Sequence, residues 1–256
     1  TLIMKKLSPP EKASYICIAA AFTGIIITTL ALNAMCEYDA VRPVEFFIVP
    51  VCALFAAIDI KKSGAEGAIM LTALCLTICA DFVMVILEDY YPISLAFFSA
   101  AQLAYYARIL FVRKAGTQNF KYLTASVCAR AAVCACIVAA ATLILPQEKL
   151  LAALAAFYFA NLAANFTEAC LLCAKRTRGN VQDTGPYAIF AAGLALFICC
   201  DICVALNAAD TAGIDLPANL LYAISLLIWI FYAPSQALLA LSVKRGLICR
   251  GSAQTN

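Results

Sequence analysis

The chain has 256 residues, of which 65% are hydrophobic and 13% charged, with a mean hydropathy of +0.92. Soluble domains are about half apolar and about a quarter charged, whereas this chain carries apolar blocks of about 20 residues, the length that spans a bilayer. A soluble fold is therefore excluded. The excess of Lys and Arg over Asp and Glu, 18 against 15, is too small to indicate a nucleic-acid partner. The complete absence of histidine excludes Ser-His-Asp triads, HExxH zinc sites and haem ligation by His.

Eight apolar blocks predict an all-α membrane protein with a single transmembrane domain over residues 1–256. The predicted spans are 14–34, 43–60, 66–88, 92–113, 121–145, 149–173, 186–208 and 217–243. The connecting segments are polar or turn-forming, and each is too short for a soluble domain. The first block is too long for a cleaved signal peptide, so we expect none. These features are typical of a multi-pass protein of a bacterial-type plasma membrane.

The basic residues predict how the spans are oriented, because cytoplasmic loops carry an excess of Lys and Arg. One set of ends and loops holds fourteen of them: Lys5, Lys6, Lys12, Lys61, Lys62, Arg113, Lys114, Lys121, Lys175, Arg176, Arg178, Lys244, Arg245 and Arg250. The opposite set holds only Arg42 and Lys149. Both termini are therefore predicted to be cytoplasmic, which agrees with an even number of spans.

The sequence contains 14 cysteines, most of them inside the apolar blocks. Two pairs, Cys170 with Cys173 and Cys200 with Cys203, have the CxxC spacing of metal and redox sites. Because histidine is absent and the neighbouring residues are small, we interpret these cysteines as small, soft hydrophobes that let helices pack closely. We predict no metal site and no cofactor.

Two segments of similar sequence, 74–81 and 194–201, each end in an aspartate, Asp81 on the third span and Asp201 on the seventh. A weaker match relates 98–102 on the fourth span to 232–236 on the eighth. Four spans separate each pair, so both halves would have the same orientation. The pattern predicts a parallel 4+4 internal repeat.

Asp81 and Asp201 are the deepest carboxyl groups, since each lies about 22 Å from the start of its span at 1.5 Å per residue. A buried charge in a bilayer is costly, so each such residue is a functional hypothesis. In one interpretation they are two protonated acids hydrogen-bonded across a helix interface. In the other they share a central cavity, one protonated and one ionised, as acid–base catalysis at neutral pH requires. We predict these two as the catalytic residues.

Other polar side chains lie inside the predicted spans, and the candidates for substrate binding among them are Gln102, Tyr105, Asn207, Tyr232, Gln236 and Arg130. Arg130 is interpreted as the one basic group well inside a span. It is either a partner for an Asp or a phosphate, or a packed and snorkelling side chain. Glu168 and Asp59 lie nearer the ends of their spans, where we expect them to snorkel. The asparagines Asn161 and Asn165 are typical of contacts between membrane helices.

These residues resemble the lysoplasmalogenase, or YhhN-like, family of eight-span membrane proteins. Ala80-Asp81 matches the family's small-residue-Asp pair in span three, and the segment from Ser94 to Tyr105 keeps the frame of its span-four motif, with Gln102 where the motif has His. The segments 193–201 and 205–207 resemble the span-seven motif. Tyr232 and the segment 235–238 resemble the span-eight motif, and the segment 42–43 resembles the family's basic-Pro pair.

The resemblance implies hydrolysis of the vinyl-ether bond of a lysoplasmalogen, or of a related single-chain ether lipid, to a fatty aldehyde and a glycerophospho-base. Such a bond is hydrolysed by protonating its β-carbon, and water then attacks the resulting oxocarbenium ion. One of Asp81 and Asp201 would be the acid and the other the anion, without a metal. Two alternatives remain open: a proton-coupled transporter or lipid translocator, and a non-catalytic lipid-binding membrane protein. The residues indicate no particular oligomeric state.

Overall fold

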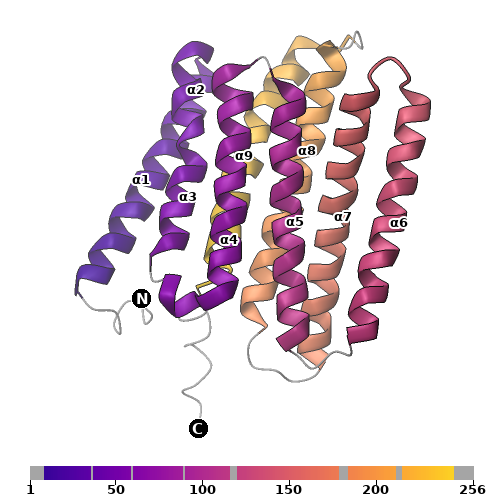
Figure 1. Ribbon diagram of the computed structural model, residues 1–256. Helices are drawn as coiled ribbons and strands as arrows, with labels where there is room; N and C mark the ends of the chain where they lie inside the picture. Colours follow the sequence, from indigo (N-terminus) through magenta and orange to yellow (C-terminus); the bar gives the residue numbers. More distant parts are fainter. Residues whose placement is uncertain are drawn as a thin grey trace.

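The structure is a computed structural model that describes residues 9–35, 37–58, 60–88, 90–115, 120–178, 184–211 and 215–244. Within these ranges every regular element is a helix, which confirms the all-α prediction (Figure 1). In chain order the elements are α1 (Pro9–Ala34), α2 (Tyr38–Phe46), α3 (Ile48–Ala57), α4 (Ile60–Asp81), the π-helix η2 (Phe82–Leu87), α5 (Tyr91–Ala115), α6 (Phe120–Ile144), α7 (Lys149–Arg178), α8 (Gly185–Thr211) and α9 (Ala218–Leu241).

Eight helical segments of the described chain are long and apolar enough to cross a membrane, so the protein is a multi-pass integral membrane protein, as predicted. These segments are Lys12–Ala34, Asp39–Ala57, Ile60–Leu87, Tyr91–Arg113, Leu123–Ile144, Lys149–Lys175, Gly185–Ala208 and Ala218–Leu241. The largest difference from the predicted bounds is at the third span, which was expected to start at residue 66. A short turn precedes it, and Gly64 (φ 58°, ψ −146°) joins that turn to the long helix in a conformation that favours glycine.

Proline interrupts the second span, which consists of α2 and α3 with Phe47 between them. Pro50 has no N–H to donate to the carbonyl of Phe46, and its ring would clash with that carbonyl in a continuous α-helix. The backbone N–H of Phe47 instead bonds to the carbonyl of Val44, three residues back. The second span is therefore two short helices in series.

The upper end of the third span is wound as a π-helix that begins directly after Asp81. Glu88, with φ 60° and ψ −16°, ends it, and its N–H bonds to the carbonyl of Val83. The hydroxyl of Ser94 on α5 donates to the carbonyl of Ala80 (3.0 Å) and so ties α5 to the backbone next to Asp81. Single π-turns are frequent at functional sites.

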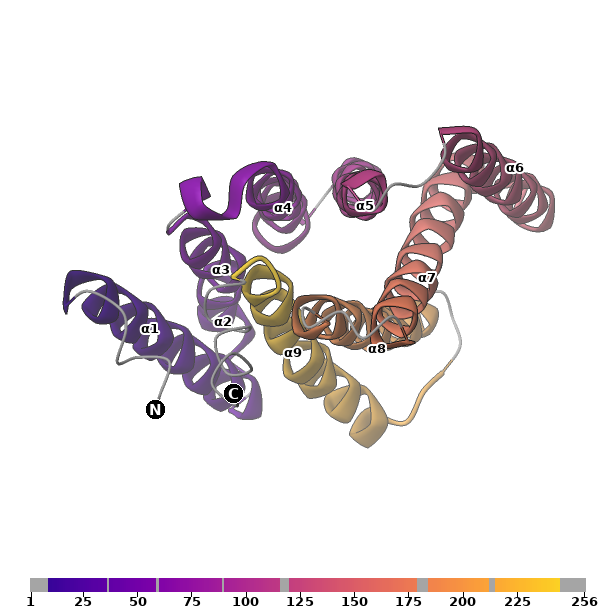
Figure 2. The same cartoon turned by 90° about the horizontal axis from the view of Figure 1, so that it is seen from below.

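Five helices form a ring: α4 packs on α5, α5 on α7, α7 on α8, α8 on α9, and α9 returns to α4 (Figure 2). The short helices α2 and α3 and the helix α1 lie on the α4–α9 side of this ring, and α6 packs on the outside of α7. Gly193 sets the spacing between α8 and α9, because a Cβ at this position would lie only 3.1 Å from side-chain atoms of Leu239.

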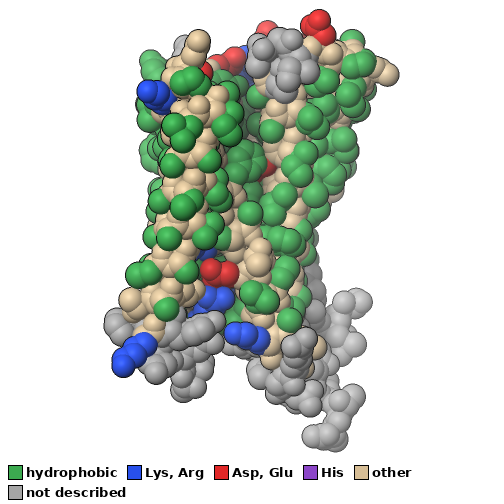
Figure 3. All heavy atoms as spheres, turned by 90° about the vertical axis from the view of Figure 1, so that its right-hand side faces the viewer, with side chains coloured by type: hydrophobic (Ala, Val, Ile, Leu, Met, Phe, Trp, Pro, Cys, Tyr) green, Lys and Arg blue, Asp and Glu red, His purple; other side chains and the backbone are tan. Residues whose placement is uncertain are grey.

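The start of α1 and the end of α9 lie at the same end of the bundle, the lower end in Figure 1. Apolar side chains cover the middle of the face in Figure 3, and most of its Lys and Arg side chains lie near the lower end. The cytoplasmic orientation of that end and the parallel repeat stay predictions. Lys5, Lys6, Asp59, Arg245 and Arg250 lie outside the described residues.

Candidate active site

The ring encloses a cavity of about 360 Å³ in the upper half of the bundle. All five ring helices and the π-helix contribute to its lining: Asp81, Met84, Val85, Tyr91, Leu95, Phe98, Leu151, Ala155, Tyr158, Phe159, Phe197, Cys200, Asp201, Val204, Ala205, Ala208, Ile228, Trp229 and Tyr232. Tyr91, Leu151 and Ala208 come from the upper helix ends and mark the mouth. The two aspartates that the sequence singled out lie at the floor of the same cavity.

Asp81 is held by a tyrosine from α9, the helix that neighbours α4 in the ring. Its side chain is buried, and the hydroxyl of Tyr232 on α9 lies 2.8 Å from Oδ1 and 2.7 Å from Oδ2. The ring of Tyr232 packs edge-on against Phe197 and Trp229, with centroid distances of 5.8 Å and 5.7 Å. Both carboxyl oxygens of Asp81 are therefore within hydrogen-bonding distance of one rigidly packed hydroxyl.

Asp201 is held by a different tyrosine. The hydroxyl of Tyr158 on α7 donates to Oδ2 of Asp201 at 2.6 Å, and the ring of Tyr158 packs against Phe98 with a centroid distance of 5.7 Å. Among the described residues, none donates a hydrogen bond to Oδ1 of Asp201. Asp201 therefore has one oxygen fixed by the protein and one left for a molecule in the cavity.

The site pairs carboxyls with phenols and not with cations. Among the described residues, no Lys or Arg side chain lines the cavity. No group of three or more His, Cys, Asp or Glu residues in the described part of the chain is placed to hold a metal ion. The arrangement offers two carboxyl groups for proton transfer, in a space whose remaining walls are mostly apolar.

The predicted substrate-binding residues are only partly brought together with the aspartates. Tyr232 lines the cavity, whereas Gln102, Tyr105 and Gln236 are fully buried below its floor. The Nδ2 of Asn165 donates to Oε1 of Gln102 at 2.9 Å and to its backbone carbonyl at 2.8 Å. Nε2 of Gln102 and Oε1 of Gln236 are buried without a hydrogen-bond partner among the described residues. Asn207 is exposed and outside the lining.

Arg130 belongs to a separate polar cluster between α6 and α7. Its guanidinium donates to Oδ1 of Asn161 and to Oδ1 of Asn165 at 2.8 Å and 2.9 Å, and it lies 3.9 Å from the ring centroid of Tyr106. Glu168 forms an ion pair with Arg113 at 2.8 Å and a longer one with Arg130 at 3.6 Å. Arg130 is thus not a partner of Asp81 or Asp201, and Glu168 is paired with arginines rather than snorkelling.

Two features of the structure were missed in the sequence. One is Arg108, which lies near the lower end of its span yet is fully buried, with its guanidinium on Glu66 (2.8 Å) and on the hydroxyl of Ser242 (2.7 Å). Tyr158, the partner of Asp201, was also missed. Its position inside an apolar span could have indicated it, because a buried tyrosine hydroxyl usually finds a hydrogen-bond partner.

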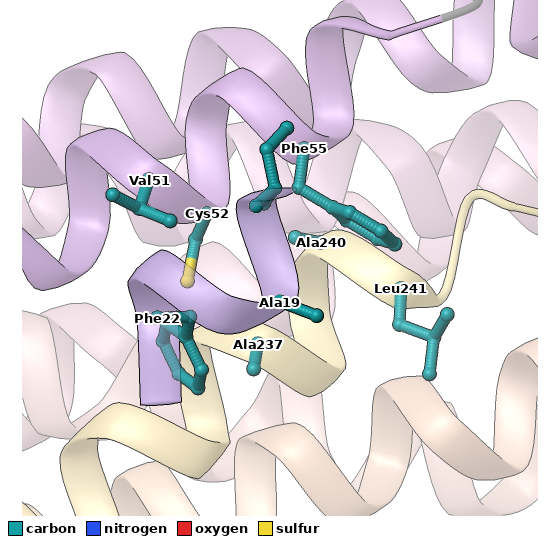
Figure 4. A pocket seen from close by; sticks show the side chains of 9 residues that line it. Ala19, Phe22, Val51, Cys52, Phe55, Ala237, Ala240 and Leu241 are labelled. Atoms are coloured by element: carbon teal, nitrogen blue, oxygen red, sulfur yellow. The ribbon is translucent and has the colours of Figure 1, made fainter. Parts of the chain in front are cut away.

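A second cavity, of about 180 Å³, lies between α1, α3 and α9 and is lined by apolar side chains (Figure 4). The thiol of Cys52 is its most polar group, between Phe22 and Val51. This cavity contains no acid–base pair, so the cavity of Asp81 and Asp201 is the better candidate for chemistry.

The fold and the site define a class of protein: a polytopic α-helical membrane protein whose helix ring encloses two phenol-bound carboxyls. The family model of the YhhN family matches residues 40–243, which is most of the chain. The chain belongs to the YhhN family, which includes lysoplasmalogenases, and this confirms the family identified from the sequence. No curated protein and no solved structure matches the chain.

Proposed function

We propose that the protein is a lysoplasmalogenase-like hydrolase. It cleaves the vinyl-ether bond of a lysoplasmalogen, or of a related single-chain ether lipid, to a fatty aldehyde and a glycerophospho-base. The observation that carries this proposal is the placement of Asp81 and Asp201 in one cavity, with phenol partners and with no Lys or Arg among the described residues that line it. Membership of the YhhN family supports it, because lysoplasmalogenase is the characterised function of that family.

The chemistry of a vinyl ether matches what two carboxyls supply. An acid transfers a proton to the β-carbon, and the electrons of the double bond form the new C–H bond. The positive charge then rests on the α-carbon and the ether oxygen as an oxocarbenium ion, which a nearby carboxylate stabilises. Two carboxylates in one apolar space repel each other, so the pair is expected to share one proton in the resting enzyme.

We assign Asp201 as the acid and Asp81 as the anion. Oδ1 of Asp201 has no donor among the described residues, so a proton on it is directed to the cavity, while Tyr158 fixes the other oxygen. Both oxygens of Asp81 lie within hydrogen-bonding distance of the hydroxyl of Tyr232, which stabilises a carboxylate by donation.

The remaining steps follow from this assignment. Asp81 takes a proton from the water that attacks the α-carbon, and a hemiacetal forms. The bond between the α-carbon and the glycerol oxygen then breaks, the glycerol oxygen gains a proton from Asp81, and the hydroxyl proton of the hemiacetal returns to Asp201 as the aldehyde forms. The sum is one vinyl ether and one water converted to one aldehyde and one alcohol, with both aspartates restored.

Gln102, Tyr105 and Gln236, which were predicted to bind substrate, instead receive the role of holding water below the floor. Gln102 and Gln236 lie about one helical turn below the floor residues Phe98 and Tyr232, at 3.6 residues per turn. Unpartnered buried polar atoms, here Nε2 of Gln102 and Oε1 of Gln236, are usually satisfied by ordered water. Arg130 and Asn207, which lie away from the cavity, receive no role in this proposal.

The test is a product assay with the purified protein in detergent, since a carrier needs two compartments and a hydrolase does not. With a 1-alkenyl lysophospholipid, we expect aldehyde and glycerophospho-base in equal amounts. The matched control is the saturated 1-alkyl analogue, which lacks the double bond and should give no product. If the alkenyl lipid raises the unfolding temperature but yields no aldehyde, the protein binds or carries the lipid and the proposal is wrong.

A further inference from the structure

None of the described residues that line the cavity recognises a phosphate by its charge. Proteins bind phosphate groups mainly through Arg and Lys side chains, often with two parallel hydrogen bonds. The polar groups at the floor are Asp81, Asp201, Tyr158 and Tyr232, and two of these four are acids. Within the described part of the chain, no basic side chain lines the cavity at its floor, its walls or its mouth.

Four described basic side chains of the helices around the cavity are candidate phosphate partners, and three of them form ion pairs elsewhere. Arg42 forms ion pairs with Glu88 and Asp39 at the upper end. Arg108 and Arg130 lie in the lower half, where Glu66 and Glu168 accept their ion pairs. Lys149 remains, an exposed residue at the start of α7 and two positions before the mouth residue Leu151.

The depth of the cavity places the phosphate of a bound substrate outside it. Phe98 on α5 and Tyr158 on α7 each lie seven residue steps below the mouth residues Tyr91 and Leu151, so the mouth lies about 10 Å above the carboxyls at 1.5 Å per step. A space of about 360 Å³ holds about a dozen groups of water size, at about 30 Å³ each. A vinyl ether at the floor, followed by the three-carbon glycerol unit, brings the phosphate to the mouth, where water can solvate it.

We propose that phosphate is not part of what this enzyme recognises, and that it also hydrolyses phosphate-free vinyl-ether lipids, the neutral 1-alkenylglycerols. The inference rests on the proposed function. The reaction is the same: Asp201 protonates the β-carbon, water adds to the α-carbon, the bond to the glycerol oxygen breaks, and the products are the fatty aldehyde and free glycerol. The glycerol oxygen leaves with a proton in both cases, so the phosphate has no part in any bond that forms or breaks.

The experiment compares two substrates of identical chain, a 1-alkenylglycerol and the corresponding 1-alkenyl-glycerophosphocholine, at equal mole fraction in the same detergent micelles. We expect kcat/KM values within about threefold of each other, because the phosphate makes no side-chain contact in the cavity. A neutral substrate that is more than a hundredfold slower, with the phosphocholine lipid turned over, overturns the inference and leaves the proposed function standing. No turnover of either lipid is the failure of the proposed function itself.

The variant Lys149→Gln tests whether Lys149, at the rim of the cavity, binds the phosphate. We expect the same ratio of the two kcat/KM values in this variant and in the parent protein. A fall of tenfold or more that is confined to the phosphocholine lipid would place the phosphate on Lys149 and contradict the inference. Lys149 is exposed and outside the cavity lining, so the fold and the turnover of the neutral lipid serve as internal controls.

Discussion

Four acidic side chains that are buried or nearly so lie in two layers of the bundle, and their partners differ between the layers. In the lower layer, Glu66 forms an ion pair with Arg108, and Glu168 forms one with Arg113. In the upper layer, Asp81 and Asp201 have tyrosine hydroxyls as partners and face a cavity that no described basic residue lines. An ion pair with an arginine holds a carboxylate ionised and fixed in place, whereas a phenol leaves it able to exchange a proton. The lower layer is therefore structural and the upper layer is suited to chemistry.

The largest expected effect is on turnover, from substitution in the upper layer. In Asp81→Asn and Asp201→Asn, each amide keeps a hydrogen-bonding oxygen but cannot transfer a proton, so we expect aldehyde release to fall by about 10³-fold or more. The unfolding temperature should stay within a few degrees of the parent value. Asp39→Asn, at a fully exposed position of the upper end, is the matched control and should keep full turnover. Parent-like rates in both site variants would show that the upper layer is not catalytic.

The next effect is on stability, from substitution in the lower layer. Arg108→Met removes the guanidinium from Glu66 and from Ser242, and breaking a buried ion pair costs about 3–5 kcal/mol. We expect a clear fall in the unfolding temperature, partly restored by adding Glu66→Gln, while turnover per folded molecule is retained. The measurement is thermal unfolding in detergent together with aldehyde release. An unchanged unfolding temperature with lost turnover would reverse the roles of the layers.

Substituting the two tyrosines tests which aspartate is the acid and which is the anion. Tyr232→Phe removes the donor next to both oxygens of Asp81, and a hydrogen bond to a charged group contributes about 1.5–3 kcal/mol. We therefore expect a fall in kcat of about 10- to 100-fold, and a smaller fall in Tyr158→Phe, because Asp201 then loses a donor to one oxygen only. Tyr222→Phe, near the exposed start of α9, is the control. A larger effect at Tyr158 would exchange the roles of the two aspartates.

The smallest expected effect comes from Glu168→Gln, also in the lower layer. Its side chain is only 15% exposed, but the amide substitute retains the size and an acceptor oxygen, so we expect a loss of about 1–2 kcal/mol in stability. Turnover should be unchanged, because Glu168 does not line the cavity. A substantial fall in kcat at full folding would connect the cluster of Arg130 to the catalytic site.

The sequence predicted the eight spans well, because apolar length is read directly from composition. It also singled out Asp81 and Asp201, since a carboxyl inside a span stands out against its neighbours. The details that depend on the local backbone were less visible. Pro50 is in the sequence, yet the break at Phe47 was not predicted, and nothing in the segment 82–87 indicates a π-helix.

The partners of the carboxyls could not be predicted, because partnership depends on which helices are neighbours. Tyr158 and Asp201 lie on adjacent helices of the ring, and Asp81 meets Tyr232 only because α9 returns to α4. Arg108 and Glu66 are each near the end of a span, where charged residues usually reach water, and their pairing is seen only in the packed structure. The sequence indicated how deep each carboxyl lies in its span, but it did not indicate which helix is its neighbour in the ring.

The central claim is that an acid held by the protein protonates the β-carbon of a vinyl ether, and turnover in D2O tests it most directly. The aldehyde is reduced to the alcohol as it forms, and the carbon next to the alcohol carbon is analysed for deuterium content and configuration. Unlabelled aldehyde incubated with Asp201→Asn corrects for exchange. The account predicts one deuterium per molecule with a single configuration, because the acid approaches one face of a bound substrate. A product without deuterium, or an equal mixture of both configurations, would contradict it.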